Sequence, residues 1–202
     1  WVELPSQLME NWTWERDALD LFARHHESGE PVPEELFGRM VAARQYMGGW
    51  AQMRQISFGT VDLALHDELA PLLCEAAVNG TPDEIDDRQG DQVMAFGQAR
   101  FERFAAEPHW AQHHGLTSFT HVFSGGYASG YYSYLWSEVL DADVFTRFQN
   151  EGIFNPDTGR SYVASILSRG DSEDPESLFE EFMGRGPDPE ALLARNLGPA
   201  PA

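Results

Sequence analysis

Two glutamates near the amino end, Glu3 and Glu10, have a spacing that suits metal chemistry. Seven residues make about two turns of an α-helix, so both side chains project from nearly the same face. Leu4, Leu8 and Trp12 lie close to them on that helix, which suggests that the acids border a buried region. Composition alone favours solvated surface acids. A buried carboxylate, however, needs a partner, and a metal ion is one of the few adequate ones.

The seven histidines contain no His-Glu-x-x-His motif, which would supply two zinc ligands and a general base. His109 and His113 have a ligand spacing, but no glutamate follows His109, and we interpret the pair as part of a loop. A metal site on His109, His113 and His114 stays open as an alternative. His25 and His26 are better explained as favourable charges at the end of the first helix.

The segment richest in chemical groups is FTHVFSGGYASGYYSYLW. Gly125 and Gly126 free the backbone for a tight or mobile approach, and a helix after them would carry Tyr127, Tyr131 and Tyr134 at positions i, i+4 and i+7. Such a stripe is either part of an aromatic core or a set of hydroxyl groups that bind a ligand. The second alternative stays open because a buried phenol needs a hydrogen-bond partner. Phenols beside a glycine pair suit the binding of a ligand or of an oxyanion as it forms.

Composition excludes several classes of partner. The 202 residues are 42% hydrophobic, enough for a real core, and carry a formal net charge of -20 with arginine as the only basic residue besides histidine. Nucleic acids and anionic membrane surfaces are therefore unlikely partners. The single cysteine, Cys74, cannot form an internal disulfide and is expected to be a small buried residue. No apolar run approaches the length of a membrane span, so a soluble, cytoplasmic protein is the simplest inference.

Helical signals dominate the chain, and the expected fold class is all-α, without an internal domain boundary. Helices are expected to begin at or near Pro5, Pro33, Trp50, Thr81, Tyr162, Asp174 and Asp188. The first of these is expected to end near Gly29 and Pro31, and Gly48 and Gly49 are expected to interrupt the second. The fourth, which begins at Thr81, is expected to run to about Phe104.

Two motifs in order, VELPSQLMENW and FTHVFSGGYASGYYSYLW, closely resemble the thimet-oligopeptidase-like zinc metallopeptidases, in the group of oligopeptidase A and dipeptidyl carboxypeptidase. The stretches RQISFGTVDLALH and EGIFNPDTGRSYVASILSRGDSEDPESLFEEFMGR are also similar to that group. The resemblance covers almost the whole chain. It departs at HWAQHHGLTS and at residues 78–92, which look unlike their counterparts in the family.

The resemblance implies that residues 1–202 are the C-terminal portion of a longer peptidase catalytic domain. Glu3 matches the third zinc ligand, while an upstream part of the same polypeptide would supply the HExxH helix with two histidine ligands and the general base. Glu10 is assigned, as a hypothesis, to orienting a ligand histidine. Because this chain lacks the HExxH motif, its zinc site is incomplete, and the chain alone is expected to be inactive.

The same resemblance assigns the downstream segment to substrate. His121, Tyr127 and Tyr134 match residues that bind the peptide and stabilise the tetrahedral intermediate, and Tyr131 is a companion in substrate binding. Gly125 and Gly126 match a mobile loop over the peptide. The implied function of the whole enzyme is zinc-dependent hydrolysis of short oligopeptides. The alternative is a non-enzymatic helical interaction domain with the tyrosines forming an aromatic groove.

Overall fold

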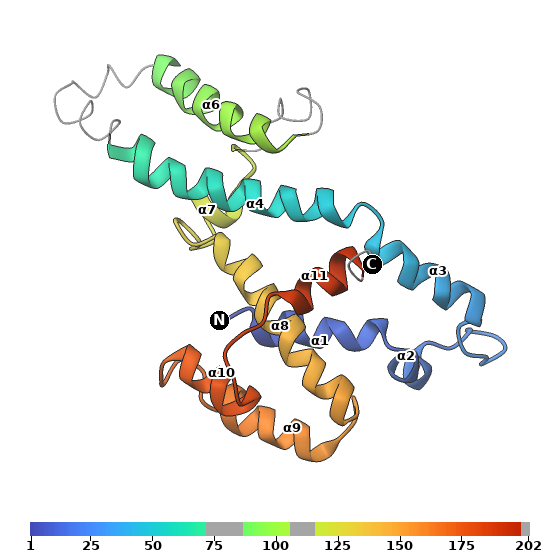
Figure 1. Ribbon diagram of the computed structural model, residues 1–202. Helices are drawn as coiled ribbons and strands as arrows, with labels where there is room; N and C mark the ends of the chain where they lie inside the picture. Colours follow the sequence, from blue (N-terminus) through green and yellow to red (C-terminus); the bar gives the residue numbers. More distant parts are fainter. Residues whose placement is uncertain (72–86, 106–115, 199–202) are drawn as a thin grey trace. The chain divides into compact units, whose positions relative to one another are not determined.

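Helices form the regular structure of the computed structural model (Figure 1), which describes residues 1–71, 87–105 and 116–198. In these ranges the only extended pairing is one isolated bridge between Arg24 and Pro31, and no strand is present. The expected all-α class is therefore confirmed. None of the helices in the same ranges is both long and apolar enough to cross a membrane.

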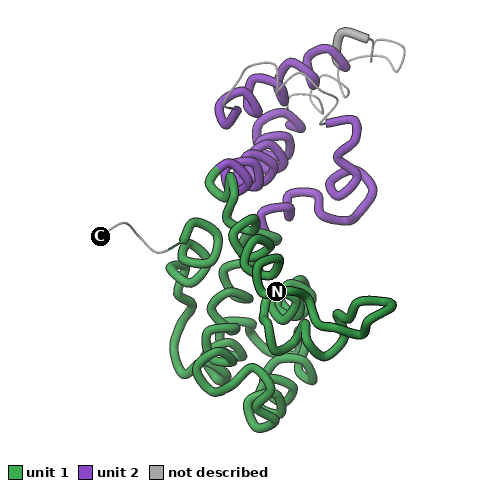
Figure 2. The backbone as a smooth tube through the Cα atoms, turned by 90° about the vertical axis from the view of Figure 1, so that its right-hand side faces the viewer, with its two compact units in different colours: residues 1–49, 134–202 green, residues 50–133 purple. Residues whose placement is uncertain are grey.

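The chain divides into two compact units, which Figure 2 colours green and purple. Unit 1 consists of Trp1–Gly49 and Tyr134–Ala202, and unit 2 consists of Trp50–Ser133. The second change of unit falls within the long helix α8 (Tyr132–Glu151). Each unit has a cluster of buried apolar side chains.

Unit 1 contains most of α8 and eight shorter elements. The latter are α1 (Leu4–Glu10), the 3-10 helix η1 (Asn11–Trp14), α2 (Arg16–Phe22), α3 (Glu34–Gln45), α9 (Pro156–Tyr162), the π-helical η6 (Val163–Leu167), α10 (Pro175–Met183) and α11 (Glu190–Leu197). The expectation of one continuous first helix was wrong, because Glu15 has extended dihedral angles (φ -100°, ψ 130°). The Trp12 ring packs at 5.0 Å from both Phe145 and Phe148, and its Nε1 donates to the Ile153 carbonyl. This packing accompanies the 3-10 turn between α1 and α2.

Helix starts were predicted well where a side chain caps the first turn. The Asp174 carboxylate accepts the Ser177 N–H at 3.1 Å, so α10 begins where its cap indicates, and Gly184 ends it with φ 73°. The helix expected near Tyr162 begins earlier, because Asn155 caps α9 by accepting the Asp157 N–H at 2.9 Å.

The glycine pair at the start of α4 (Gly48–Ala64) does not interrupt a helix, contrary to expectation. The break lies just before it, where Met47 has a φ of 55°. A Cβ atom on Gly48 would lie 2.2 Å from the Asn196 carbonyl oxygen, so the glycine permits close backbone contact with α11. Its role is in packing rather than in ending a helix.

His25 and His26 also differ from expectation, because α2 ends at Phe22 and neither histidine lies in its last turn. The His25 N–H donates to the Glu30 carbonyl at 2.8 Å, and its Nδ1 accepts the Ser28 N–H at 3.1 Å. These bonds stabilise a turn after the helix instead of its end.

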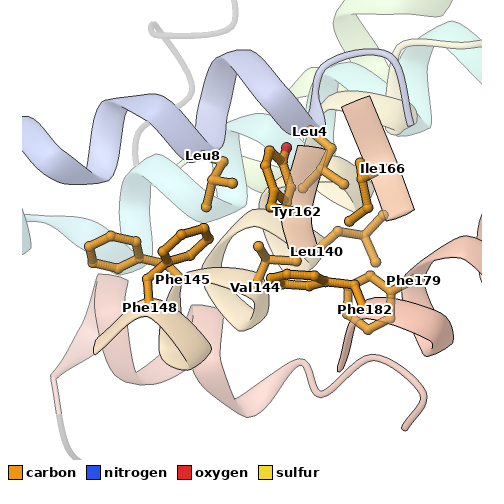
Figure 3. Close-up of a cluster of buried hydrophobic side chains, with 10 residues drawn as sticks. All are labelled: Leu4, Leu8, Leu140, Val144, Phe145, Phe148, Tyr162, Ile166, Phe179 and Phe182. Atoms are coloured by element: carbon orange, nitrogen blue, oxygen red, sulfur yellow. The ribbon is translucent and has the colours of Figure 1, made fainter. Parts of the chain in front are cut away.

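The core of unit 1 is formed where α1 packs on α8 and the carboxyl-terminal helices (Figure 3). Burying each large apolar side chain contributes about 1.5–3 kcal/mol, and Leu4, Leu8 and Val144 are fully inaccessible to solvent. This packing fixes the face of α1 that turns inward. The buried members are Leu4, Leu8, Leu140, Val144, Phe145, Phe148, Tyr162, Ile166, Phe179 and Phe182.

A buried polar network joins α8 to the elements around it. The Asp141 carboxylate, 1% exposed, accepts the Asn11 side-chain N–H at 2.7 Å and pairs with Arg195 of α11. Arg44 of α3 donates to Asn11 Oδ1 at 3.2 Å. Burial raises the pKa of Asp141, and the Arg195 guanidinium opposes that shift. Both contacts of Asp141 go to its Oδ1, whereas Oδ2 has no hydrogen-bond partner among the described residues. The network therefore links η1, α3, α8 and α11 through one carboxylate oxygen and Asn11.

Tyr162 lies in the same core (Figure 3). Its hydroxyl has no hydrogen-bond partner among the residues that the structure describes. Tyr162→Phe in the full-length protein should therefore leave the free energy of unfolding unchanged or raise it by up to about 1–3 kcal/mol. Burial raises the pKa of Tyr162, so the folded state holds its proton more tightly. The wild type should lose stability above about pH 10, where the unfolded chain ionises, and the variant should lose less.

Thermal unfolding at pH 8 and pH 10.5 measures both effects. Tyr46→Phe, at a side chain that is 78% exposed, is the matched control and should change neither. A lower melting temperature for Tyr162→Phe at pH 8 would mean that the hydroxyl is stabilising.

Unit 2 contains most of α4, the π-helical η2 (Leu65–Leu69), α6 (Asp87–Phe101), the 3-10 helix η4 (Glu102–Phe104) and α7 (Thr120–Phe123). Its buried cluster is Val61, Leu65, Leu69 and Leu116. The predicted end of the fourth helix near Phe104 is confirmed. Its predicted start at Thr81 lies outside the described residues, as do Cys74, His109, His113 and His114.

Candidate functional site

Glu3 and Glu10 lie at the two ends of α1, Glu3 as the residue before the helix and Glu10 as its last residue. Leu4 and Leu8 are fully buried, which turns the opposite side of the helix away from the core. Glu3, Gln7 and Glu10 occupy positions i, i+4 and i+7 and therefore form one polar stripe. The predicted common face of the two acids is present.

This stripe is connected to α8 at one of the predicted tyrosines. Gln7 Nε2 donates a hydrogen bond of 3.3 Å to the main-chain carbonyl of Tyr134, 127 residues away in the sequence. Glu3 is half-buried, and its Oε2 accepts from the Ser6 hydroxyl at 3.2 Å. The helix that carries Glu3 is thus packed against the turn of α8 that carries Tyr134.

Glu10 lies at a polar pocket of about 230 Å³. Burial raises the pKa of Glu138, which lies on α8 in the same pocket; Arg195 opposes this shift, and the charge of Glu10 reinforces it. Glu10 itself is exposed. The residues that line the pocket are Gln7, Glu10, Arg44, Glu138, Asp141, Arg195 and Asn196.

Glu3 is not part of a complete metal site among the residues that the structure describes. No group of three His, Cys, Asp or Glu side chains suited to a metal occurs within residues 1–71, 87–105 and 116–198. A zinc site in a peptidase needs three protein ligands. Glu3 offers a partly accessible carboxylate, and the Ser6 hydroxyl lies 2.9 Å from its main-chain carbonyl and 3.2 Å from its Oε2.

In unit 2, three predicted residues lie together. The rings of His121 and Tyr131 meet edge-to-face with centroids 5.7 Å apart, and the centroids of His121 and Tyr127 are 6.2 Å apart. Phe119 packs on Tyr131 at 4.9 Å, and the Tyr131 hydroxyl donates to Gln55 Oε1 at 3.2 Å. An imidazole and two phenols therefore line one surface of this unit.

The predicted stripe of tyrosines on a single helix was wrong. Only Tyr134 lies on α8, which begins at Tyr132, whereas Tyr127 and Tyr131 belong to the preceding turn. The Gly130 N–H donates to the Tyr127 carbonyl at 2.8 Å, and Ser129 has a φ of 57°, which a right-handed helix does not allow. A groove built from one tyrosine-bearing helix face, as in the interaction-domain alternative, is therefore not formed.

Gly125 and Gly126 have specific backbone roles after α7. A Cβ atom on Gly125 would lie 2.9 Å from the His121 Cα atom, so no other residue fits there without a shift. Gly126 has a φ of 81°, and the Tyr127 N–H then donates to the His121 carbonyl at 3.0 Å. This bond closes the turn that follows α7.

The residues of α4 that hold this turn were not predicted from the sequence. Asp62 is fully buried and accepts the main-chain N–H groups of Ser129 and Tyr131 at 3.0 and 2.9 Å. Gln55, which contacts the Tyr131 hydroxyl, was also missed. The available signal was a charged residue beside Val61 and at helical spacing from Leu65, because a carboxylate among apolar positions needs donors.

Comparison with known proteins identifies the chain at the family level. The model of Peptidase family M3 matches residues 1–197. The chain belongs to peptidase family M3. The resemblance predicted from the motifs around Glu3 and His121 is thereby confirmed.

Relatives within the M3 group include several oligopeptidases. The chain is 44% identical over 195 residues to "Oligopeptidase A" of Escherichia coli (strain K12), which covers 95% of this chain and 26% of that protein. It is 40% identical over 202 residues to "Organellar oligopeptidase A, chloroplastic/mitochondrial" of Arabidopsis thaliana, covering 96% and 23%. It is 31% identical over 186 residues to "Dipeptidyl carboxypeptidase" of E. coli K12, covering 92% and 25%.

These alignments define how much of an M3 protein is present. The chain spans about a quarter of the length of the relatives it matches. Glu3, Glu10 and Tyr134 belong to unit 1, while His121, Gly125, Gly126, Tyr127 and Tyr131 belong to unit 2. Any enzymatic activity is therefore considered below for the full-length protein and not for this chain by itself.

Proposed function

We propose that the full-length protein is a zinc-dependent metallopeptidase that hydrolyses peptide bonds in short oligopeptides. The observation that supports this most directly is the hydrogen bond from Gln7 to the Tyr134 carbonyl, which packs the Glu3 helix against the tyrosine end of α8. Membership in peptidase family M3 supports the reaction class. Cytoplasmic location stays a prediction.

Glu3 is proposed as one zinc ligand, with two histidines and the general base supplied by an upstream part of the same polypeptide. Zinc, when bound in such a site, polarises the scissile carbonyl and lowers the pKa of water. Within this chain, Glu3 would contribute an anionic carboxylate oxygen from a partly accessible side chain. Glu10 is proposed to orient a ligand histidine from the same helix face. Since the chain has one of three ligands and no base, it should be inactive alone.

The imidazole and phenols are proposed to act on the peptide itself. His121 and Tyr127 would bind it, and Tyr134 would donate its phenolic proton to the developing oxyanion. A donor placed where negative charge develops stabilises the transition state more than the ground state. Tyr131 and the backbone at Gly125 and Gly126 would bind the substrate chain.

Hydrolysis by purified full-length protein tests the proposal. We expect cleavage of a short, internally quenched peptide. A chelator should abolish cleavage, and added Zn²⁺ should restore it. A stably folded globular protein serves as the comparison substrate and should not be cleaved. Absence of cleavage, or cleavage that chelation does not change, would contradict the proposed function.

A further inference from the structure

Asp62 of α4 is a buried carboxylate that the proposed chemistry does not use directly. It is 0% exposed, and each of its oxygens accepts one main-chain N–H, Oδ1 from Ser129 at 3.0 Å and Oδ2 from Tyr131 at 2.9 Å. His66 Nδ1 lies 3.2 Å from Oδ1 on the same helix face. A buried charge is tolerated when its hydrogen bonds are made, and here the donors come from a distant turn.

The two N–H groups that Asp62 accepts belong to a turn and not to a regular helix. Ser129 has a φ of 57°, and Tyr131 directly precedes the first residue of α8. The first N–H groups at a helix start have no partner within the helix. Asp62 therefore acts as a cap supplied by another helix, and it stabilises a backbone conformation that a non-glycine residue adopts at a cost.

Other residues of α4 hold the same turn, spaced to share one helix face. The Phe58 ring meets the Tyr131 ring edge-to-face at 5.5 Å, and Gln55 accepts the Tyr131 hydroxyl at 3.2 Å. A Cβ atom on Gly59 would lie 3.4 Å from the Tyr132 Cα atom, so the two backbones are in close contact. Both the main-chain N–H and the phenol of Tyr131 are thus fixed by one helix.

We propose that Asp62 is a positioning residue for peptide hydrolysis, acting through the backbone of Ser129 and Tyr131. It fixes the Tyr131 ring against His121 and holds the backbone of Tyr131, which lies three residues before Tyr134 along the chain. This inference rests on the proposed function. Misplacement of a reacting group by about 1 Å costs up to about 100-fold in rate, so the anchor has a measurable kinetic consequence.

Asp62→Asn in the full-length protein is the test. The asparagine oxygen accepts one N–H, but its NH₂ group faces the other N–H donor, so one of the two bonds is lost. We expect kcat to fall by about 10–100-fold with KM changed less than about threefold, and bound zinc unchanged. Amide hydrogen exchange at residues 129–131 should become faster. Asp67→Asn, at an exposed acid in the adjoining η2, is the matched control and should change none of these.

The two readouts separate failure of this inference from failure of the proposed function. If the wild type cleaves no peptide, the proposed function fails, while exchange at residues 129–131 still tests the anchor. Unchanged exchange in Asp62→Asn would overturn the anchor. Faster exchange with unchanged kcat in an active enzyme would overturn the positioning role.

A folding defect in Asp62→Asn, seen as lost zinc or lost near-ultraviolet circular dichroism, calls for a second variant. Asp62→Glu keeps the charge and both acceptor oxygens on a longer side chain. Because the longer side chain displaces the turn, we expect zinc to be retained and kcat to fall by about 10-fold or more. A kcat equal to that of the wild type would overturn the proposal.

Discussion

Glu3→Gln in the full-length protein should lower kcat/KM for a short peptide by more than about 100-fold. The loss should exceed the 10–100-fold effect typical of residues that only orient a metal ligand. Glutamine has nearly the same size and keeps the place of Glu3 at the start of α1, but it lacks the anionic oxygen that zinc binds. Steady-state hydrolysis at a fixed free zinc concentration measures the effect.

Two further acids on the same chain serve as comparisons. Glu10→Gln should weaken zinc retention and lower kcat/KM by about 10-fold, in keeping with a residue that orients a ligand. Glu27→Gln, at an exposed side chain in the turn after α2, should have no effect. If Glu3→Gln behaved like Glu27→Gln, Glu3 would have no role as a metal ligand.

Tyr134→Phe should lower kcat by about 100–1000-fold with little change in KM, the magnitude typical of losing one oxyanion donor. The substitution removes only the hydroxyl, while the Tyr134 carbonyl still accepts the Gln7 hydrogen bond. The packing of α1 on α8 is therefore preserved, and the kinetic change reports on the phenolic proton.

Tyr46→Phe is the matched control, because that side chain is 78% exposed and lies outside the proposed site. Its kcat and KM should equal those of the wild type. A raised KM at unchanged kcat for Tyr134→Phe would assign the hydroxyl to ground-state binding, and no change in either constant would exclude it from the reaction.

Local signals predicted the parts of the fold that depend on few residues. The Asp174 cap and the following Pro175 define the start of α10, because both act within one turn. The break at Glu15 could not be predicted this way. It accompanies the packing of Trp12 between Phe145 and Phe148, residues more than 130 positions away, and such contacts override helical periodicity.

In the candidate site, too, features that depend on local spacing were predicted and features that depend on distant contacts were not. The common face of Glu3 and Glu10 follows from their spacing alone, and the structure has it. The positions of Tyr127 and Tyr131 were mispredicted, because their spacing fits a helix while Ser129 adopts a φ of 57°. Asp62 stabilises that conformation by accepting the Ser129 N–H, a contact between residues 67 positions apart. No local pattern encodes a contact of that range.

Bound zinc reports whether the Glu3 carboxylate is a metal ligand. Full-length wild type and Glu3→Gln should be dialysed against the same buffered zinc solution, and bound metal should be counted per polypeptide by mass spectrometry. We expect about one zinc ion per wild-type polypeptide, since a catalytic site of this kind holds one ion, and substantially less in the variant. Equal zinc in both proteins would contradict the assignment of Glu3 as a ligand.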